Sequence, residues 1–249
     1  MIARIRNGLA MLSPALGYGL DIERGGTTAF LITVDYDTAQ KADSEEAHIE
    51  GARLILDLSR RFEVPVTWAV CGERADRDIS LFEEVKASLG ELAYHTYSHR
   101  LIPQMSSEEL QEDHRRWVAL VGRSPTSLVF PHNEEGMFPE LVRLGFKAFR
   151  PRAHRVGIPY ASQGMVAVPP VTAFGPDTDY RVLLSYVGLC RRYGAVAHFW
   201  THPCNAKRAQ AEPLFRAAAD FERKTLSQFA LETQDRLEAR SDGVARLGG

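Results

Sequence analysis

The sequence predicts one α/β domain made of parallel βα units, arranged either as a barrel or as a doubly wound sheet. Short runs of β-branched and apolar residues alternate with longer segments in which apolar residues recur at helical spacing. The 249 residues show no composition break and no internal repeat, and a chain of this length can enclose one large core. In both architectures the chemistry lies at the carboxyl ends of the strands.

The first half of the chain contains regular βα units. A buried strand is expected over 27–37, where an apolar run ends in acidic residues. Between Ser44 and Phe62, an apolar stripe at helical spacing predicts a helix. The same patterns predict the elements that follow, which are a strand over 64–70, a helix over 78–89 and a strand over 90–95.

The second half repeats the alternation with one irregular segment. Ser106 and Glu109 form a capping box that opens a helix ending near Gly122. The segment 151–180 is rich in Pro and Gly and has no period, so it predicts a loop that includes one short strand at most. The other expected elements are strands over 127–131, 146–150 and 195–203, and helices over 137–145, 179–194 and 212–239.

Composition narrows the class of protein. Apolar residues make up 45% and charged residues 25%, as in an ordinary globular protein. The net charge of −2 argues against a nucleic-acid partner and against a polybasic membrane-surface protein. Three widely spaced cysteines form no disulfide framework, which favours reduced thiols in a cytoplasmic protein.

The two ends of the chain are expected to lie outside the main domain, which then spans 29–240 and includes the long C-terminal helix. Residues 1–28 are interrupted by Pro14 and several glycines, and they are too short and broken for stable membrane insertion. We expect them to form an extension packed on the domain. Residues 241–249 are polar and are expected to be a flexible tail. The C-terminal helix could pack on its own domain or on a second subunit in a homo-oligomer.

Acidic and imidazole side chains follow several predicted strands at corresponding places. Each has a common structural explanation, since Asp at a strand end often forms a turn and an isolated HxxxH pair usually lies on the surface. In a parallel sheet, however, all of them would face one mouth, and the structural explanations would have to hold for every residue at once. These residues are Asp35 and Asp37, His95 and His99, His132 and Asn133, and His202.

Two imidazoles and one carboxylate can hold a divalent ion such as zinc, with positions left open for water and substrate. Such an ion lowers the pKa of a bound water and polarises a carbonyl oxygen. A second carboxylate could then act as general base, and a histidine on the opposite wall as general acid. This set of groups predicts a hydrolase for an amide-like bond.

Four stretches, "TVDYD", "HTYSH", "FPHN" and "FWTHP", resemble successive motifs of the polysaccharide deacetylase family, which shares the NodB homology domain. The resemblance covers roughly residues 29–205 and implies a distorted (β/α) barrel. It also implies metal-dependent removal of an N-acetyl or N-acyl group from an amino sugar or glycan precursor. The metal would be Zn²⁺, with Co²⁺ or Ni²⁺ as alternatives.

The matching positions imply roles for individual residues. Asp37, His95 and His99 would bind the metal, Asp35 would be the catalytic base and His202 the general acid. The resemblance further implies a substrate pocket that includes Tyr36, Phe130, His132, Asn133, Arg150 and Trp200. His198 lies deeper on the face of the strand that also carries His202, and we assign it to the core or to a supporting role.

The sequence departs from the family at two points. Tyr36 separates two aspartates that are adjacent in many members, and His132 stands where many members have an arginine that orients the base. Arg150 is the candidate to supply the missing charge. Two other functions stay open: hydrolysis of another non-peptide C–N bond, as in cyclic amides of the allantoin type, and a catalytically inactive relative that binds carbohydrate.

Overall fold

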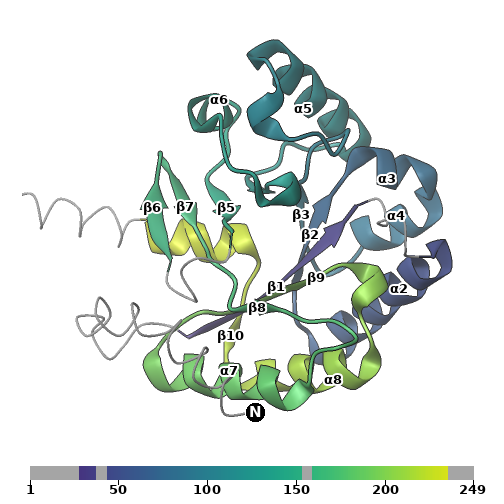
Figure 1. Ribbon diagram of the computed structural model, residues 1–249, viewed down its shortest axis with the longest axis vertical. Coiled ribbons are helices and arrows are strands. Elements are labelled where there is room, and N and C mark those ends of the chain that lie inside the picture. The colour runs from purple at the N-terminus through teal and green to yellow at the C-terminus, as the bar shows by residue number, and fades with distance from the viewer. Residues whose placement is uncertain (1–27, 38–43, 153–158, 235–249) are drawn as a thin grey trace, which may run out of the picture.

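A curled, mostly parallel sheet with helices on its outer side forms the framework of the protein (Figure 1). The computed structural model describes residues 28–37, 44–152 and 159–234. The sheet has the strand order β6-β7-β5-β4-β3-β2-β1-β9-β8, and β10 pairs with the beginning of β1. All strand pairs are parallel except the β6–β7 hairpin. The sheet curls into an incomplete barrel, here called the half-barrel, whose edges are β6 and β8.

Strands β1 to β5 and β9 form the wall that the site uses. β1 lies at the centre, with β2 on one side and β9 on the other. The strand bounds are β1 Ala29–Tyr36, β2 Val66–Val70, β3 Gly90–Tyr94, β4 Ser127–Val129, β5 Ala148–Arg150, β6 Tyr160–Ser162, β7 Met165–Ala167, β8 Thr172–Ala173, β9 Ala197–Thr201 and β10 Glu222–Arg223.

The helices begin and end at residues that the sequence marks. Ser44 caps α2, the Ser106–Glu109 capping box opens α5, and Gly194 ends α7 in the left-handed conformation. The α-helices are α2 Glu45–Phe62, α3 Gly72–Arg77, α4 Ile79–Lys86, α5 Ser107–Val121, α6 Phe138–Arg143, α7 Tyr180–Tyr193 and α8 Arg208–Ala217. Short 3₁₀ turns are η1 Ile102–Gln104, η2 Pro131–Asn133, η3 Pro203–Asn205 and η4 Ala218–Asp220.

The two faces of β1 lie in different surroundings. Phe30, Ile32, Val34 and Tyr36 belong to the larger core cluster that joins the sheet to the helices. Alternate residues of a strand point to opposite faces, so the odd-numbered residues of β1, from Ala29 to Asp35, face the inside of the half-barrel. The inner face is apolar at its base, where residues 226–230 of the C-terminal helix close it, and becomes polar toward the carboxyl end of β1.

Two sequence-based expectations are wrong. The segment 151–180 contains three short strands (β6, β7 and β8) instead of one at most, because its residues complete both edges of the sheet. The single helix expected over 212–239 is broken. α8 ends at Ala217, β10 then pairs with β1, and a new helix occupies residues 226–234.

Tertiary contacts explain that break. Phe221 is buried at the turn between α8 and β10, and an unbroken helix would not let residues 222–223 extend the sheet. The Thr225 side chain accepts from the backbone N–H of Gln228, and the Gln228 side chain accepts from the backbone N–H of Thr225. This capping box restarts the helix and directs it under the half-barrel.

Some expectations concern residues that the structure does not describe. The N-terminal extension (apart from residue 28), the tail over 241–249 and the last residues of the C-terminal helix lie outside the described ranges. Within those ranges, no helix has the length and apolar character needed to cross a membrane.

Candidate active site

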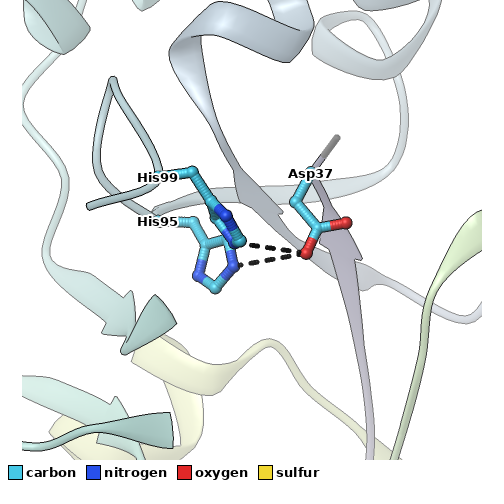
Figure 2. A group of neighbouring side chains, drawn as sticks. All are labelled: Asp37, His95 and His99. Carbon is cyan, nitrogen blue, oxygen red and sulfur yellow. Dashed lines mark ion pairs between the residues drawn. The ribbon is translucent and has the colours of Figure 1, made fainter. Parts of the chain in front are cut away.

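Asp37, His95 and His99 lie together at the carboxyl ends of β1 and β3, with their side chains pointing toward one another (Figure 2). One ligand atom from each residue can be chosen so that all lie within 4.8 Å of one another. Asp37 Oδ2 lies 3.8 Å from His95 Nε2 and 3.4 Å from His99 Nε2. Among the described residues, this is the one group with three side chains at metal-ligand distances.

The ring nitrogens of this group are set up to act as ligands. His95 Nδ1 donates a hydrogen bond to the Val129 carbonyl oxygen at 2.8 Å, which leaves the lone pair of Nε2 free toward Asp37. His95 Nε2 and His99 Nε2 are both buried and have no hydrogen-bond partner. Buried polar atoms rarely stay unpartnered. A divalent ion between these nitrogens and the carboxylate fits this observation, and the donor set suits zinc.

The turn that bears His95 and His99 has an unusual backbone. Thr96 and His99 both have φ near 55°, in the left-handed region that non-glycine residues seldom adopt. The carbonyl oxygens of Thr96 and Tyr97 accept from backbone N–H groups at the start of α3. Adding a Cβ at Gly72 would bring it within 2.2 Å of the Tyr97 ring, so α3 packs tightly under the turn.

On the other side of the site, Asp35 is fixed by Arg150. The two guanidinium nitrogens Nη1 and Nη2 each lie 2.6 Å from one oxygen of the Asp35 carboxylate, and both side chains are almost fully buried. Burial alone would raise the pKa of Asp35, but the Arg150 guanidinium outweighs it and holds the pKa below the ordinary value. The guanidinium also lies 4.7 Å from the centre of the Trp200 ring, a cation–π distance.

A hydrogen-bonded chain continues from Arg150 into the core. Arg150 Nη1 donates to Thr33 Oγ1 at 3.0 Å, and Thr33 Oγ1 lies 3.2 Å from His198 Nε2. His198 Nδ1 donates to the Val168 carbonyl oxygen at 3.0 Å. Burial, followed by the nearby Arg150 charge, lowers the pKa of His198 to about 3, so the ring is neutral and its Nε2 accepts from Thr33.

His202 lies between the two aspartates. Its Nε2 is 3.4 Å from Asp37 Oδ2 and 4.0 Å from Asp35 Oδ2. Burial opposes protonation, but the two carboxylates outweigh it and raise the pKa of His202 above its usual value. The Trp200 ring packs edge-on against His202, with 5.5 Å between the ring centres.

The residues expected in the substrate pocket divide into two groups. Tyr36 and Phe130 do not line an accessible pocket: Tyr36 is fully buried against Trp68, and Phe130 is buried against Phe149. The expectation is wrong for both, because strand alternation turns Tyr36 to the helix side and the local chain buries Phe130 in the core.

His132, Asn133 and Trp200 remain at least partly exposed near the site. The His132 ring lies 4.9 Å from the His99 ring, centre to centre, and both His132 and Asn133 have positive φ. Arg150 is near the site but almost fully buried. Its guanidinium packs against the Trp200 ring, which is partly exposed to solvent. Of these partly exposed side chains, His132 therefore lies beside His99 and Trp200 beside His202.

Sequence reasoning missed several supporting residues. Thr33 joins Arg150 to His198 and could have been recognised as a polar residue inside an otherwise apolar strand. Arg74 is fully buried on α3, where it donates to His48 Nε2 at 3.2 Å and pairs with Glu45. Burial and then the Arg74 charge lower the pKa of His48 to about 4. Nothing in the sequence near Arg74 signals this pairing.

Comparison with known proteins agrees with the fold and the motifs. Residues 27–136 match the family model described as polysaccharide deacetylase. No curated protein matches the chain. The match to the family confirms the resemblance inferred from the motifs.

Solved structures extend the comparison over most of the chain. A Mycobacterium smegmatis protein described as a polysaccharide deacetylase aligns with a TM-score of 0.71 at 18% identity, covering 88% of this chain and 94% of that one. PuuE allantoinase aligns with a TM-score of 0.60 at 17% identity, covering 84% and 92%. A CE4 family pseudoenzyme from Bacillus anthracis gives 0.55 at 13% identity, covering 81% and 65%. At these identities the likeness concerns the fold, and it confirms the distorted barrel of the NodB type.

Proposed function

We propose that the protein removes an N-acetyl or N-acyl group from an amino sugar or glycan precursor and that it depends on a divalent metal ion. The match of residues 27–136 to the polysaccharide deacetylase family model supports this proposal. One observation carries the proposal. Two buried imidazole nitrogens without hydrogen-bond partners face the Asp37 carboxylate, while Asp35 and His202 lie beside them.

Asp37, His95 and His99 would hold the ion, and Zn²⁺ fits two imidazoles and a carboxylate best, with Co²⁺ or Ni²⁺ as alternatives. When bound, the ion supplies Lewis-acid polarisation and makes water more acidic. The Asp37 carboxylate is well prepared to be a ligand. Burial raises its pKa, but the neighbouring imidazoles of His202, His95 and His99 outweigh burial and lower the pKa below the ordinary value.

The other groups divide the proton transfers between them. Asp35 takes a proton from the water that adds to the acyl carbon, and its lowered pKa leaves it ionised and ready as a base at neutral pH. His202 gives its proton to the nitrogen as the C–N bond breaks, and its raised pKa favours the protonated form. The products are a carboxylate and a free amine.

Arg150 acts on Asp35 and does not need to touch substrate. Its two hydrogen bonds fix both carboxylate oxygens, so the base keeps one orientation. In many relatives an arginine at the position of His132 would orient the base. Here we assign that role to Arg150 on β5. Trp200, His132 and Asn133 are the side chains we assign to the sugar, since they remain accessible beside the metal ligands.

The test is acetate release from N-acetylated sugars by the purified protein. A chelator should abolish release, and adding back Zn²⁺, Co²⁺ or Ni²⁺ one at a time should restore it. Asp35→Asn should lower kcat by about 10²–10⁴-fold while leaving bound metal unchanged. Acetate release that is unaffected by the chelator would overturn the metal-dependent mechanism.

Hydrolysis of a cyclic amide is the second candidate, favoured by the structural likeness to PuuE allantoinase. The same base, acid and ligand set would serve, since both reactions break a non-peptide C–N bond. Ring opening of allantoin without acetate release from sugars would support it. Absence of both activities in a metal-loaded protein would instead favour a carbohydrate-binding relative without activity, as the pseudoenzyme neighbour illustrates.

We also propose a cytoplasmic location, supported by three cysteines that form no disulfide. The substrate would then be a small amide or a sugar precursor available in that compartment. Gel filtration of the purified chain would decide between a monomer and a homo-oligomer.

A further inference from the structure

One side chain of α5, Asp113, accepts four hydrogen bonds from the turn that carries His95 and His99 and from the adjoining Tyr94. Asp113 Oδ1 accepts from the Tyr94 hydroxyl at 2.6 Å and from the Tyr97 backbone N–H at 2.5 Å. Asp113 Oδ2 accepts from the Ser98 backbone N–H at 3.1 Å and from the Ser98 hydroxyl at 2.6 Å. One carboxylate therefore holds two consecutive amides that lie between the two proposed metal ligands.

The position of Asp113 on its helix is unusual for an acid. Leu110, Asp113 and Trp117 lie on the buried face of α5, and Asp113 is 7% exposed. A buried carboxylate is unfavourable unless hydrogen bonds compensate it. Among the hydrogen bonds and ion pairs of the described residues, those of Asp113 all come from the segment Tyr94–Ser98 and none from a lysine or arginine. Its bonding capacity is thus directed to this turn.

The turn needs such a partner because its backbone is strained. Thr96 is β-branched and fully buried, yet it has φ near 55°, and His99 adopts the same region. The two ligands also differ in how their rings are held. His95 donates to the Val129 carbonyl oxygen, whereas the His99 ring contacts Asp37 and the His95 and His132 rings without donating to any backbone carbonyl of the described residues. The orientation of His99 therefore depends on its backbone, and Ser98 directly precedes it.

We propose that Asp113 is a positioning residue that sets the metal affinity of the site by holding His99, and to a smaller degree His95, in ligand geometry. This inference rests on the proposed metal site formed by Asp37, His95 and His99. Replacing a residue that supports a metal ligand commonly lowers the metal affinity by about 10–100-fold. Asp113 would act in this way through the backbone instead of through a direct bond to an imidazole.

The experiment measures the Zn²⁺ dissociation constant by competition with a chromophoric chelator. Asp113→Asn keeps the size of the side chain but replaces one carboxylate oxygen with an NH₂ group. The two donors that this oxygen accepts from, either those of Tyr94 and Tyr97 or the two of Ser98, then lose their acceptor. We expect the dissociation constant to rise about 10–100-fold. The matched control is Glu112→Gln, an exposed neighbour on α5 that pairs only with Arg115 among the described contacts, and it should change the constant less than about 2-fold.

A second readout separates positioning from a general loss of folding. At saturating Zn²⁺, the Asp113→Asn protein should recover most of its kcat with an unchanged KM, because the ligands themselves are intact. If this variant does not fold, Ser98→Ala and Tyr94→Phe each remove one donor and keep the carboxylate. Each is expected to weaken Zn²⁺ binding about 5-fold, the effect of one net hydrogen bond.

The outcomes distinguish this inference from the proposed function. A wild-type protein that does not bind Zn²⁺ would overturn both. Tight Zn²⁺ binding by the wild-type protein together with an unchanged dissociation constant in Asp113→Asn would overturn the role of Asp113 alone. If Asp113→Asn does not fold, unchanged constants in both Ser98→Ala and Tyr94→Phe would do the same.

Discussion

The two halves of the candidate site are built differently. The base half, Asp35 with Arg150, Thr33 and His198, lies on strands β1, β5 and β9, and each of these polar side chains is paired within the protein. The metal half, Asp37 with His95 and His99, lies just beyond the strand ends, and two of its ring nitrogens have no hydrogen-bond partner.

This difference indicates how each half reaches its working geometry. The base half is already satisfied by internal hydrogen bonds, so its arrangement depends on the folded sheet alone. The metal half contains a turn with positive φ at Thr96 and His99 and two ring nitrogens without hydrogen-bond partners, so under our proposals Asp113 would support the turn and an ion would satisfy the nitrogens. Replacements in the first half should mainly affect stability and rate, and those in the second should mainly affect metal content.

The largest expected effect is on the metal half. His99→Ala should remove bound metal and abolish acetate release. The loss of metal affinity should exceed about 100-fold, the upper range for replacing residues that only support a ligand. Elemental analysis and an acetate assay would measure both. Asp35→Asn is the matching variant in the base half. It should lower kcat and leave the metal content unchanged. Normal metal content in His99→Ala would contradict the ligand assignment.

Arg150→Met tests the base half. It would leave Asp35 buried without its cation, and we expect a loss of about 3–5 kcal/mol in the free energy of unfolding together with reduced kcat. The double variant Arg150→Met with Asp35→Asn should recover part of the stability but not the activity. Urea unfolding would measure these differences. Arg143→Met, at an exposed ion pair, serves as control and should cost about 1 kcal/mol or less.

The pH dependence of stability probes the neutral histidine beneath the base. His198 has a pKa of about 3 in the folded protein, whereas an unfolded histidine has a pKa near 6.5. Below pH 6.5 the unfolded chain therefore takes up a proton that the folded protein does not, and stability falls as the pH falls. Between pH 7 and 5 this contributes a loss of about 2 kcal/mol. His198→Gln should remove that contribution, and equal pH slopes in both proteins would contradict a neutral His198.

The smallest effect is expected at the mouth of the site. His132→Ala removes an exposed ring that packs on His99, so it should change stability by less than about 1 kcal/mol and leave metal content intact. Because His132 is accessible beside the ligands, we expect KM for the sugar to rise more than kcat falls. Steady-state kinetics would detect this. Loss of metal in His132→Ala would instead place His132 in the metal half.

Much of the fold could be predicted from local patterns. The strand over 27–37, the helices after Ser44 and Ser106 and the end of a helix at Gly194 all follow from periodicity and capping residues, which act over a few neighbouring residues. The long helix over 212–239 could not be corrected in this way. Its interruption depends on β10 pairing with β1, about 190 residues away in the sequence.

The sequence by itself determined the chemical groups and the edge of the sheet where they gather, because parallel strands bring their carboxyl ends together. Only the tertiary structure decided which partners those groups have. It paired Asp35 with Arg150, turned Tyr36 and Phe130 into the core, and placed Asp113 under the turn of His95 and His99. These pairings join residues from different elements, and they depend on distances and burial that no local pattern encodes.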